Sequence, residues 1–196
     1  MVENTAIMAG GQSRRFNRDK TLEILDGRRL IEYPADTFRG RVKRLAVVAK
    51  DCSKYSFLGI ECVRDIYEQQ CPMVGILSVL KAFNAPVFVI AADTPFVLYS
   101  HAEKLWGYIA DADAVVPVIF GKHHPLYACY NVGMVPVFED AVSRGDFSLM
   151  KSFDRAKVVY LDESQILSSE NEKKSFININ TEADIKSINM GGFQRG

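Results

Sequence analysis

The sequence lacks any excess of one charge, because 24 Lys and Arg residues stand against 24 Asp and Glu residues. Nucleic acid and anionic membranes are therefore not expected as partners, and any anion must be bound by a few locally placed groups. Long apolar runs are also missing, since those near residues 86–92 and 114–120 fall far short of the ~20 residues that span a bilayer. No basic segment followed by an apolar core opens the chain, so no secretory signal is expected. These absences predict a cytoplasmic protein that acts on small molecules.

Cysteine is scarce, and its spacing excludes the common metal sites. The four cysteines, Cys52, Cys62, Cys71 and Cys129, include no C-x-x-C pair and have no histidine at the spacing of a zinc site. Thiols stay reduced in most proteins that are not secreted. We therefore expect free thiols, buried or incidental, rather than a metal centre.

What the sequence does contain is enough apolar side chain for one large core. Of its 196 residues, 48% are hydrophobic and 24% are charged, and no internal repeat or low-complexity linker is visible. This size and composition predict a single domain over residues 1–190, followed by a short tail, 191–196.

Apolar runs alternate with amphipathic stretches along the chain. Strands are expected at residues 6–9, 45–49, 62–63, 87–91, 114–118, 126–130 and 157–161. Helices are expected at residues 30–38, 73–83, 100–108, 135–143 and 149–153. Several of the strands are continuously apolar, as in a parallel sheet that is covered on both faces. The alternation predicts an α/β fold.

Two weaker expectations concern the last part of the chain. The polar segment 164–174 mixes acidic and basic residues and is expected to be a surface loop or a frayed turn. Thr181 and Asp184 have the spacing of a capping box, which predicts a final helix to about residue 188.

The densest group of candidate binding residues lies between Thr5 and Lys20. An apolar strand ends there at two adjacent glycines, Gly10 and Gly11, and basic residues follow, among them Arg15. Adjacent glycines let the backbone approach a phosphate closely, and basic side chains add charge-assisted hydrogen bonds. A plain glycine turn with a solvated basic face explains these residues equally well. The stretch matches neither a P-loop nor the dinucleotide-binding fingerprint.

The same stretch resembles the signature A-G-G-x-S-x-R-M-G-x-D-K of the molybdenum cofactor guanylyltransferase (molybdopterin-guanine dinucleotide biosynthesis protein A) family. The matching positions are Ala9, Gly10, Gly11, Ser13, Arg15, Asp19 and Lys20. Phe16 and Asn17 stand where the family usually has Met-Gly. The resemblance extends to about residue 185 and implies a Rossmann-like nucleotidyltransferase fold, with a mostly parallel central sheet flanked by helices.

Two carboxylates follow expected strands. Asp93 comes after the apolar run 87–91, where open α/β sheets bind ligands, and its oxygens suit Mg²⁺ held together with nucleotide phosphates. A turn residue before Pro95 is the other interpretation, and Asp65 on its own is typical of a surface turn. The resemblance favours binding, because residues 92–96 resemble the family's D-x-P-F motif, whose Asp binds Mg²⁺. In the family, an Asp in the place of Asp65 contacts the nucleotide or the metal.

Two further segments resemble parts of the family's site. Residues 71–75 resemble the G-P-L-A-G loop that lies against the base, with Cys71 in place of the first glycine. His124-Pro125-Leu126 resembles the H-P-L segment on the acceptor side. From the residues alone, His123 and His124 are expected to be a loop pair with one side chain exposed, because adjacent residues of an extended segment point to opposite faces.

Residues Phe176–Thr181, with the sequence FININT, resemble the segment of the family that faces the pterin acceptor. The resemblance assigns this role to Asn178 and Asn180. As a strand, the segment would place both amides on one side and Ile177 and Ile179 toward the core. A strand edge bridged by its amides is the alternative.

By this resemblance, the protein would transfer GMP from GTP to the terminal phosphate of molybdopterin and release pyrophosphate, with Mg²⁺ as the cofactor. The implied catalytic residues are Arg15, Lys20 and Asp93, of which Asp93 is also the metal ligand. The residues implied to bind GTP or molybdopterin are Met8, Ala9, Gly10, Gly11, Lys20, Asp65, Asp93, Asn178 and Asn180. Apo-molybdoenzymes and other cofactor-biosynthesis proteins are the implied protein partners.

Two alternative functions stay open. One is a related enzyme that transfers CMP to the same acceptor, or a sugar-phosphate nucleotidyltransferase, and turnover with GTP, CTP and UTP separates these. The other is a non-catalytic carrier of nucleotide or molybdopterin, which would bind nucleotide without releasing pyrophosphate.

Overall fold

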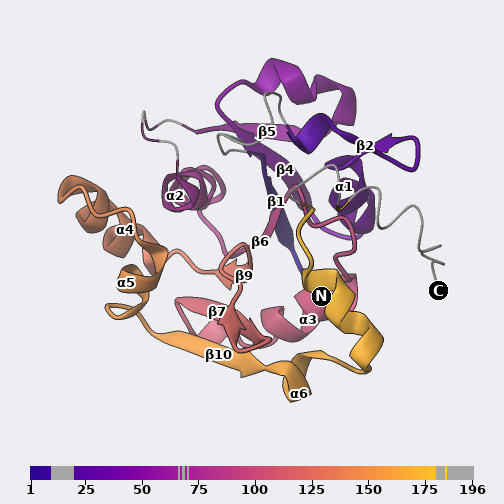
Figure 1. The fold of residues 1–196 in the computed structure, drawn as a ribbon. Coiled ribbons are helices and arrows are strands. Elements are labelled where there is room, and N and C mark those ends of the chain that lie inside the picture. Colours follow the sequence, from indigo (N-terminus) through magenta and orange to yellow (C-terminus); the bar gives the residue numbers. More distant parts are fainter. Residues whose placement is uncertain (10–19, 66, 68, 70, 180–183, 185–196) are drawn as a thin grey trace.

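One eight-stranded sheet organises the structure (Figure 1). The computed structural model describes residues 1–9, 20–65, 67, 69, 71–179 and 184. The strand order is β10-β7-β9-β6-β1-β4-β5, with β8 paired to β7 outside this path, and β2 and β3 form a separate hairpin. The strands are β1 (Asn4–Met8), β2 (Ile24–Leu25), β3 (Arg28–Arg29), β4 (Arg44–Ala49), β5 (Glu61–Arg64), β6 (Val87–Ala91), β7 (Ala114–Ile119), β8 (Lys122–His123), β9 (Tyr127–Tyr130) and β10 (Val158–Asp162).

Most strands of this sheet run parallel, as the uninterrupted apolar runs predict. β1 is parallel to β4 and to β6, β4 is parallel to β5, and β10 is parallel to β7. β9 and β8 differ, because β9 pairs antiparallel with both β6 and β7, and the short β8 pairs antiparallel with β7. The α/β fold with a mostly parallel sheet is therefore confirmed, and it includes a reversed strand that the sequence pattern does not reveal.

Alternation along the strands gives the sheet two apolar faces. The helices are α1 (Glu32–Phe38), α2 (Pro72–Phe83), α3 (Tyr99–Trp106), α4 (Met134–Ser143), α5 (Leu149–Phe153) and α6 (Glu163–Ile166), with 3-10 helices η1 (Lys20–Leu22), η2 (Cys52–Leu58), η3 (Ile109–Asp111) and η4 (Glu170–Phe176). Ile7 and Phe88 point into the core that α1 and α3 cover, whereas Ala6 and Val89 point into the core of α2, α4 and α5. Figure 1 shows α1 and α2 on opposite sides of the sheet. Within the described chain, none of the helices has both the length and the apolar character needed to cross a membrane.

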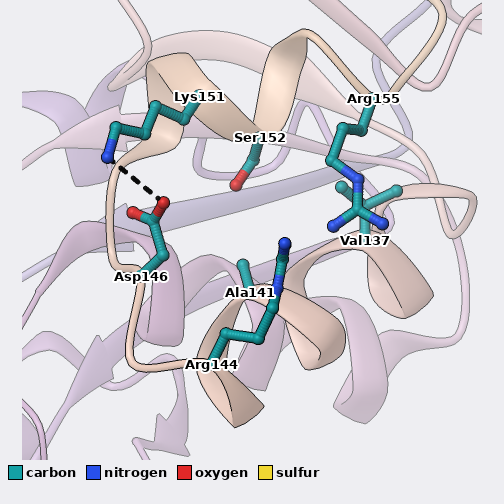
Figure 2. A pocket seen from close by; sticks show the side chains of 7 residues that line it. All are labelled: Val137, Ala141, Arg144, Asp146, Lys151, Ser152 and Arg155. Carbon is teal, nitrogen blue, oxygen red and sulfur yellow. Dashed lines mark ion pairs between the residues drawn. The ribbon is translucent and has the colours of Figure 1, made fainter.

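A small surface pocket lies between α4 and α5 (Figure 2). Its lining residues are Val137, Ala141, Arg144, Asp146, Lys151, Ser152 and Arg155. Lys151 Nζ lies 3.4 Å from Asp146 Oδ2, and both Arg144 and Arg155 pair with Asp140 of α4. These ion pairs compensate most of the charge and tie the end of α5 to α4.

The expectation of a loop over residues 164–174 is wrong, because α6 and η4 occupy most of this segment. Its charged and polar side chains cap and pair within these short helices, although most of them are exposed to solvent. Asp162 and Gln165 form a capping box at the start of α6. In η4, Lys173 Nζ lies 2.8 Å from Glu170 Oε2.

The expected strand over Phe176–Asn180 is also wrong in its described part. Phe176 ends η4, and residues 177–179 are extended without pairing into the sheet. Ile177 is 43% exposed, whereas Ile179 is 1% exposed, so the predicted inward direction holds for Ile179 alone. The helix expected from Thr181 lies outside the described residues, apart from a single helical residue, 184.

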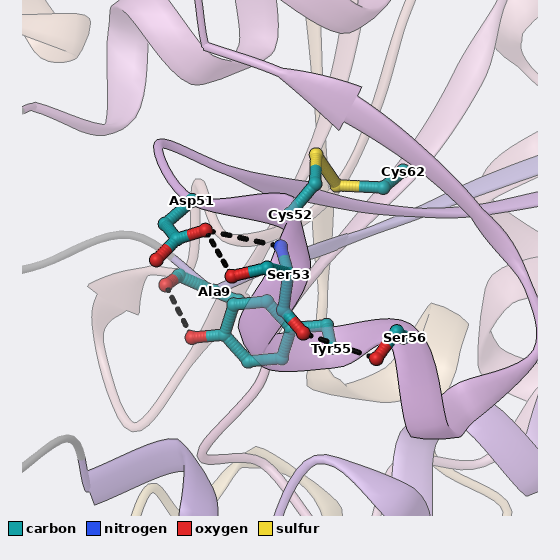
Figure 3. Close-up of a disulfide and its surroundings, with 7 residues drawn as sticks. All are labelled: Ala9, Asp51, Cys52, Ser53, Tyr55, Ser56 and Cys62. Carbon is teal, nitrogen blue, oxygen red and sulfur yellow. Dashed lines mark hydrogen bonds between the residues drawn. A yellow bond between two sulfur atoms is a disulfide. The ribbon is translucent and has the colours of Figure 1, made fainter.

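The expectation that the cysteines are free is wrong for Cys52 and Cys62, which form a disulfide (Figure 3). Cys52 begins η2 shortly after β4, and Cys62 lies on the adjacent parallel strand β5. This short crossover brings the two Cα atoms to 5.9 Å, a separation that a disulfide spans. Cys71 and Cys129 are free.

The direction of chain winding reverses between β1 and β6. The chain passes from β1 to β4 by way of α1 on one face, and from β5 to β6 by way of α2 on the other face. β6 therefore lies beside β1 on the side opposite β4. Open α/β sheets bind ligands outside the carboxyl ends of their strands at such a reversal. The carboxyl ends of β1 and β6 are thus where a binding site is expected.

Candidate active site

The carboxyl ends of β1 and β6 are joined by backbone hydrogen bonds. Met8, the last residue of β1, accepts a hydrogen bond of 3.1 Å at its backbone oxygen from Ala92 N, just after β6. On the other side of β1, Ala9 N donates to Val48 O of β4 over 3.0 Å. These bonds hold Ala9 beside Ala92, the residue that precedes Asp93. Ala9 is the start of the stretch 9–20, which we call the glycine-basic segment.

Asp93 is nearly buried at this edge. It follows a strand whose five residues are all buried, and it is itself 7% exposed. Its backbone oxygen accepts a hydrogen bond of 2.9 Å from Ile179 N. Beside it, Thr94 Oγ1 donates to Asn178 Oδ1 over 3.1 Å. The structure therefore brings the Asp93 segment and the Asn178 segment together.

Asp65 follows β5 at the same edge of the sheet but farther from β1. Its Oδ1 accepts a hydrogen bond of 3.2 Å from Tyr67 N and lies 3.3 Å from Ser78 Oγ of α2. Its Oδ2 lies 3.6 Å from Lys50 Nζ. Two strands, β4 and β1, separate β5 from β6, which puts Asp65 about 14 Å from Asp93 at ~4.8 Å per strand. The two carboxylates are therefore too far apart to ligate one ion.

Only the flanks of the glycine-basic segment belong to the described chain. The predicted site residues that lie outside it are Gly10, Gly11, Arg15 and Asn180. On one flank Ala9 is half-buried after β1, and on the other Lys20 begins η1. The hydroxyl of Tyr55, from η2, lies 3.2 Å from Ala9 O and 3.1 Å from Thr21 Oγ1. One buried hydroxyl therefore contacts both flanks.

The first turn of α2 packs closely against the end of β1. Residues 71–75, which resemble the family's loop against the base, are the N-cap Cys71 and the first helical residues of α2, with Pro72 at the start. A Cβ atom at Gly75 would lie 2.4 Å from Met8 Cε. The glycine therefore leaves the space that the end of the Met8 side chain occupies.

A buried polar network holds η4 against α3 and β9. His101 of α3 is fully buried, and its Nε2 lies 2.9 Å from Glu172 Oε2. On the other side of the ring, Nδ1 lies 3.1 Å from Ser175 Oγ and 3.3 Å from Tyr127 OH. Tyr127 OH also accepts a hydrogen bond of 3.1 Å from Leu98 N. The network thus joins the segment that leads to residue 178 to the segment that follows residue 93.

The partners of His101 are satisfied when its ring is neutral. A carboxylate only accepts, so Nε2 carries the hydrogen that Glu172 receives. Ser175 Oγ donates to Glu172 O over 2.7 Å, which leaves Tyr127 OH as the donor to Nδ1. Burial lowers the pKa of His101 despite the opposite effect of Glu172, and the charge of Lys104 lowers it further. A second hydrogen on Nδ1 would displace the one that Tyr127 donates.

Sequence reasoning missed Tyr55, His101 and Tyr127 because each acts through contacts between distant segments. The spacing of His101 and Leu105 on α3 places both on its apolar stripe, and this is the one sequence signal that the histidine is buried. For the histidine pair, the expected exposure is confirmed, since His123 is exposed and His124 is half-buried, but the expected loop is wrong for His123, which belongs to the short strand β8.

Comparison with known proteins identifies the family. The sequence model described as the MobA-like NTP transferase domain matches residues 5–158. A probable molybdenum cofactor guanylyltransferase of Aquifex aeolicus is 30% identical over 188 residues, which are 95% of this chain and 90% of that protein. Another, from Carboxydothermus hydrogenoformans, is 29% identical over 184 residues, 93% of each protein. The crystal structure of molybdopterin-guanine dinucleotide biosynthesis protein A from Archaeoglobus fulgidus matches with a TM-score of 0.82 at 28% identity, covering 94% of this chain and 95% of that chain.

The chain therefore belongs to the MobA-like NTP transferase family, a family of nucleotidyltransferases. The resemblance found in the glycine-basic segment is confirmed at the level of the family. The mostly parallel sheet flanked by helices is the Rossmann-like fold of its structural relatives.

His101 should make the stability of the protein depend on pH in the acid range. Its folded-state pKa lies below the usual value of about 6.5. At a pH between the folded-state pKa and the unfolded-state pKa of about 6.5, the unfolded chain binds a proton at this histidine that the folded chain does not. The free energy of unfolding therefore falls as the pH drops below about 6.5. In His101→Gln this contribution should vanish. The measurement is denaturant unfolding at pH 7.5, 6.5 and 5.5, with the exposed His123→Gln as control. A slope in His101→Gln as steep as in the wild type would contradict the assignment.

Proposed function

We propose that the chain transfers GMP from GTP to the terminal phosphate of molybdopterin and releases pyrophosphate. The observation that carries the proposal is the meeting of Asp93 with residues 178–179 at the ends of β6 and β1. The names of the relatives, which are molybdenum cofactor guanylyltransferases, support the same reaction. Residues 1–190 would act as one nucleotidyltransferase domain.

The donor set around Asp93 suits a Mg²⁺ ion that arrives with the nucleotide. Mg²⁺ is usually held by one or two carboxylates together with substrate phosphates, rather than by protein groups alone. Asp93 supplies one nearly buried carboxylate. In the part of the chain that the structure describes, no cluster of three or more His, Cys, Asp or Glu side chains could hold a metal by itself. Asp93 is thus the proposed protein ligand, and the ion would neutralise charge on the phosphates.

The glycine-basic segment is the proposed site for the phosphates of GTP. Met8 and Ala9 lead the backbone out of β1 at this edge. The N–H groups at Gly10 and Gly11 would approach the phosphates closely, because no Cβ stands in the way. The basic side chains of the segment, Arg15 and Lys20, would stabilise the charge of the departing pyrophosphate.

Asn178 and Asn180 are proposed to face molybdopterin. Asn178 is exposed and accepts a hydrogen bond at Oδ1 from Thr94, which sets the side chain beside Asp93. An amide donates hydrogen bonds to an anionic phosphate without adding a charge that repels it. This placement would hold the acceptor next to the nucleotide.

The proposed reaction requires no nucleophile from the protein. An oxygen of the acceptor phosphate attacks the α-phosphorus of GTP, the bond between this phosphorus and the oxygen bridging to the β-phosphate breaks, and pyrophosphate leaves with the bonding electrons. Catalysis of phosphoryl-type transfers depends mainly on positioning and on neutralising charge. The glycine-basic segment and the contact of residues 93–94 with residues 178–179 would supply these two effects.

GTP with Mg²⁺ should raise the melting temperature more than CTP, UTP or ATP does. A ligand that binds only the folded state stabilises it by about 2.7 kcal/mol at a hundredfold excess over its Kd. The check is a thermal melt with each nucleotide at equal concentration. Equal shifts with all four would remove the guanine assignment, and a larger shift with CTP would favour the cytidylyl alternative.

Lys20→Ala should weaken GTP binding at least tenfold and nearly abolish transfer, because the variant lacks the ammonium group that would contact the phosphate. Lys43→Ala is the matched control. Lys43 is 72% exposed in its side chain and pairs with Glu3 at 2.9 Å, a surface pair that contributes about 0–1 kcal/mol. Titration calorimetry with GTP gives the affinities. If both variants bind GTP alike, the segment is a solvated turn.

Asp93→Asn should fold normally and lose metal-dependent turnover by a factor on the order of 10² or more, as when one preorganised electrostatic contact is removed. Asn keeps the shape and the local turn bonds of Asp but carries no charge. Pyrophosphate release against Mg²⁺ concentration, with a melting curve, measures both effects. Asp65→Asn is the control, since Asp65 is too far away to share the ion and should alter GTP affinity rather than Mg²⁺ dependence. Turnover at the wild-type level in folded Asp93→Asn would contradict the assignment of Asp93 as a metal ligand.

A further inference from the structure

The disulfide fixes the short helix that reaches the glycine-basic segment (Figure 3). Cys52, the first residue of η2, is bonded to Cys62 of β5. Asp51 caps the same end, since its Oδ1 accepts hydrogen bonds from Ser53 N at 3.0 Å and from Ser53 Oγ at 2.6 Å. A 3-10 helix has poorer hydrogen bonds than an α-helix and depends more on such anchors. The disulfide therefore links η2 covalently to the sheet.

Tyr55 is the residue of η2 that contacts the flanks of the segment. Its side chain is buried at 3% exposure, and its hydroxyl donates to Ala9 O over 3.2 Å. Because this carbonyl can only accept, the hydroxyl hydrogen of Tyr55 is committed to it, and Thr21 Oγ1 is the donor in the second contact of 3.1 Å. Ala9 and Thr21 lie on either side of residues 10–20. We call Tyr55 with these two partners the Tyr55 clamp.

We propose that Tyr55 is a positioning residue for nucleotide binding, and that the Cys52–Cys62 disulfide holds the Tyr55 hydroxyl in place against its two partners in the Tyr55 clamp. Reduction of the disulfide would then weaken GTP binding without unfolding the protein. The inference rests on the proposed function, because it takes the segment between Ala9 and Thr21 to hold the phosphates.

The reduction step needs a dithiol as reductant. One thiolate of the dithiol attacks a sulfur of the Cys52–Cys62 bond and forms a mixed disulfide, and its second thiol displaces the remaining protein sulfur. The protein gains two electrons and two protons as two thiols, and the dithiol becomes a cyclic disulfide. Without the cross-link, η2 retains the buried side chains of Tyr55 and Leu58 and the 2.9 Å bond from Arg39 Nη2 to Leu58 O. The helix should thus stay folded and hold the hydroxyl less firmly.

The variant that isolates the clamp is Tyr55→Phe, which keeps the buried ring and removes the hydroxyl. We expect its Kd for GTP to rise about tenfold, the effect of losing one or two buried hydrogen bonds. In turnover, KM for GTP should rise while KM for the acceptor stays unchanged. Tyr130→Phe is the matched control, because Tyr130 is fully buried and donates to Pro125 O at 2.7 Å, away from both flanks. Equal GTP affinities in the two variants would overturn the role of Tyr55.

The role of the disulfide is tested with a dithiol and with Cys52→Ser combined with Cys62→Ser. The dithiol should raise the Kd for GTP several-fold in the wild type. The double variant should have a raised Kd from the start, and the dithiol should leave that Kd unchanged. An unchanged wild-type Kd with fully reduced cysteines would overturn this part. A dithiol effect of equal size in the double variant would overturn it too, since the effect would then not arise from the Cys52–Cys62 bond.

Hydrogen exchange without nucleotide separates this inference from the proposed function. Peptides that cover residues 5–9 and 21–25 should exchange faster in Tyr55→Phe and in the reduced wild type. Faster exchange in a protein that binds no GTP in any form would overturn the proposed function and support the Tyr55 clamp. Unchanged exchange together with wild-type GTP affinity would overturn the clamp and leave the proposed function standing.

Discussion

The pairing of β1 with β4 on one side and β6 on the other fixes where the described parts of the candidate site lie. Because the three strands are parallel, their carboxyl ends meet at one edge, and the bonds from Ala92 N to Met8 O and from Ala9 N to Val48 O continue this alignment past the strands. Ala92, which precedes Asp93, and Met8, which lies just before the glycine-basic segment, are thus neighbours although they are far apart in sequence. Displacing β1 by one residue would turn Ile7 from one core to the other, so the register is held by burial on both faces.

The elements that could be predicted are those whose pattern is local. Continuous apolar runs identified β4, β6 and β7 because a strand covered on both faces needs no polar side, and the apolar stripe of α2 identified that helix. The antiparallel direction of β9 could not be predicted, because a buried strand has the same apolar pattern whether it runs parallel or antiparallel to its neighbours. The disulfide was missed for a related reason. Cys52 and Cys62 are close because a crossover places two parallel strands side by side, and spacing in the sequence does not show this.

The residues of the candidate site also fall into those that a local sequence pattern reveals and those that depend on tertiary contacts. Asp93 could be found from the sequence because it interrupts an apolar run, and Asn178 because it belongs to a specific motif, and the structure brings the two together. What positions them was not visible. His101 is the hub of bonds that reach Tyr127 and Glu172, and such a network exists only once α3, β9 and η4 are packed. Burial of polar groups is tolerated there because each hydrogen has an acceptor.

The contact between Gly75 and Met8 has a consequence for how this site can change. Met8 Cε occupies the place of the missing β-carbon on the first turn of α2, and a thioether chain can rotate aside at low cost. A larger residue at position 75 would therefore be accommodated by moving Met8, and the displaced methyl group would alter the packing at the carboxyl end of β1. The shape of the binding surface can be adjusted from within the helix, while every polar group of the site stays as it is.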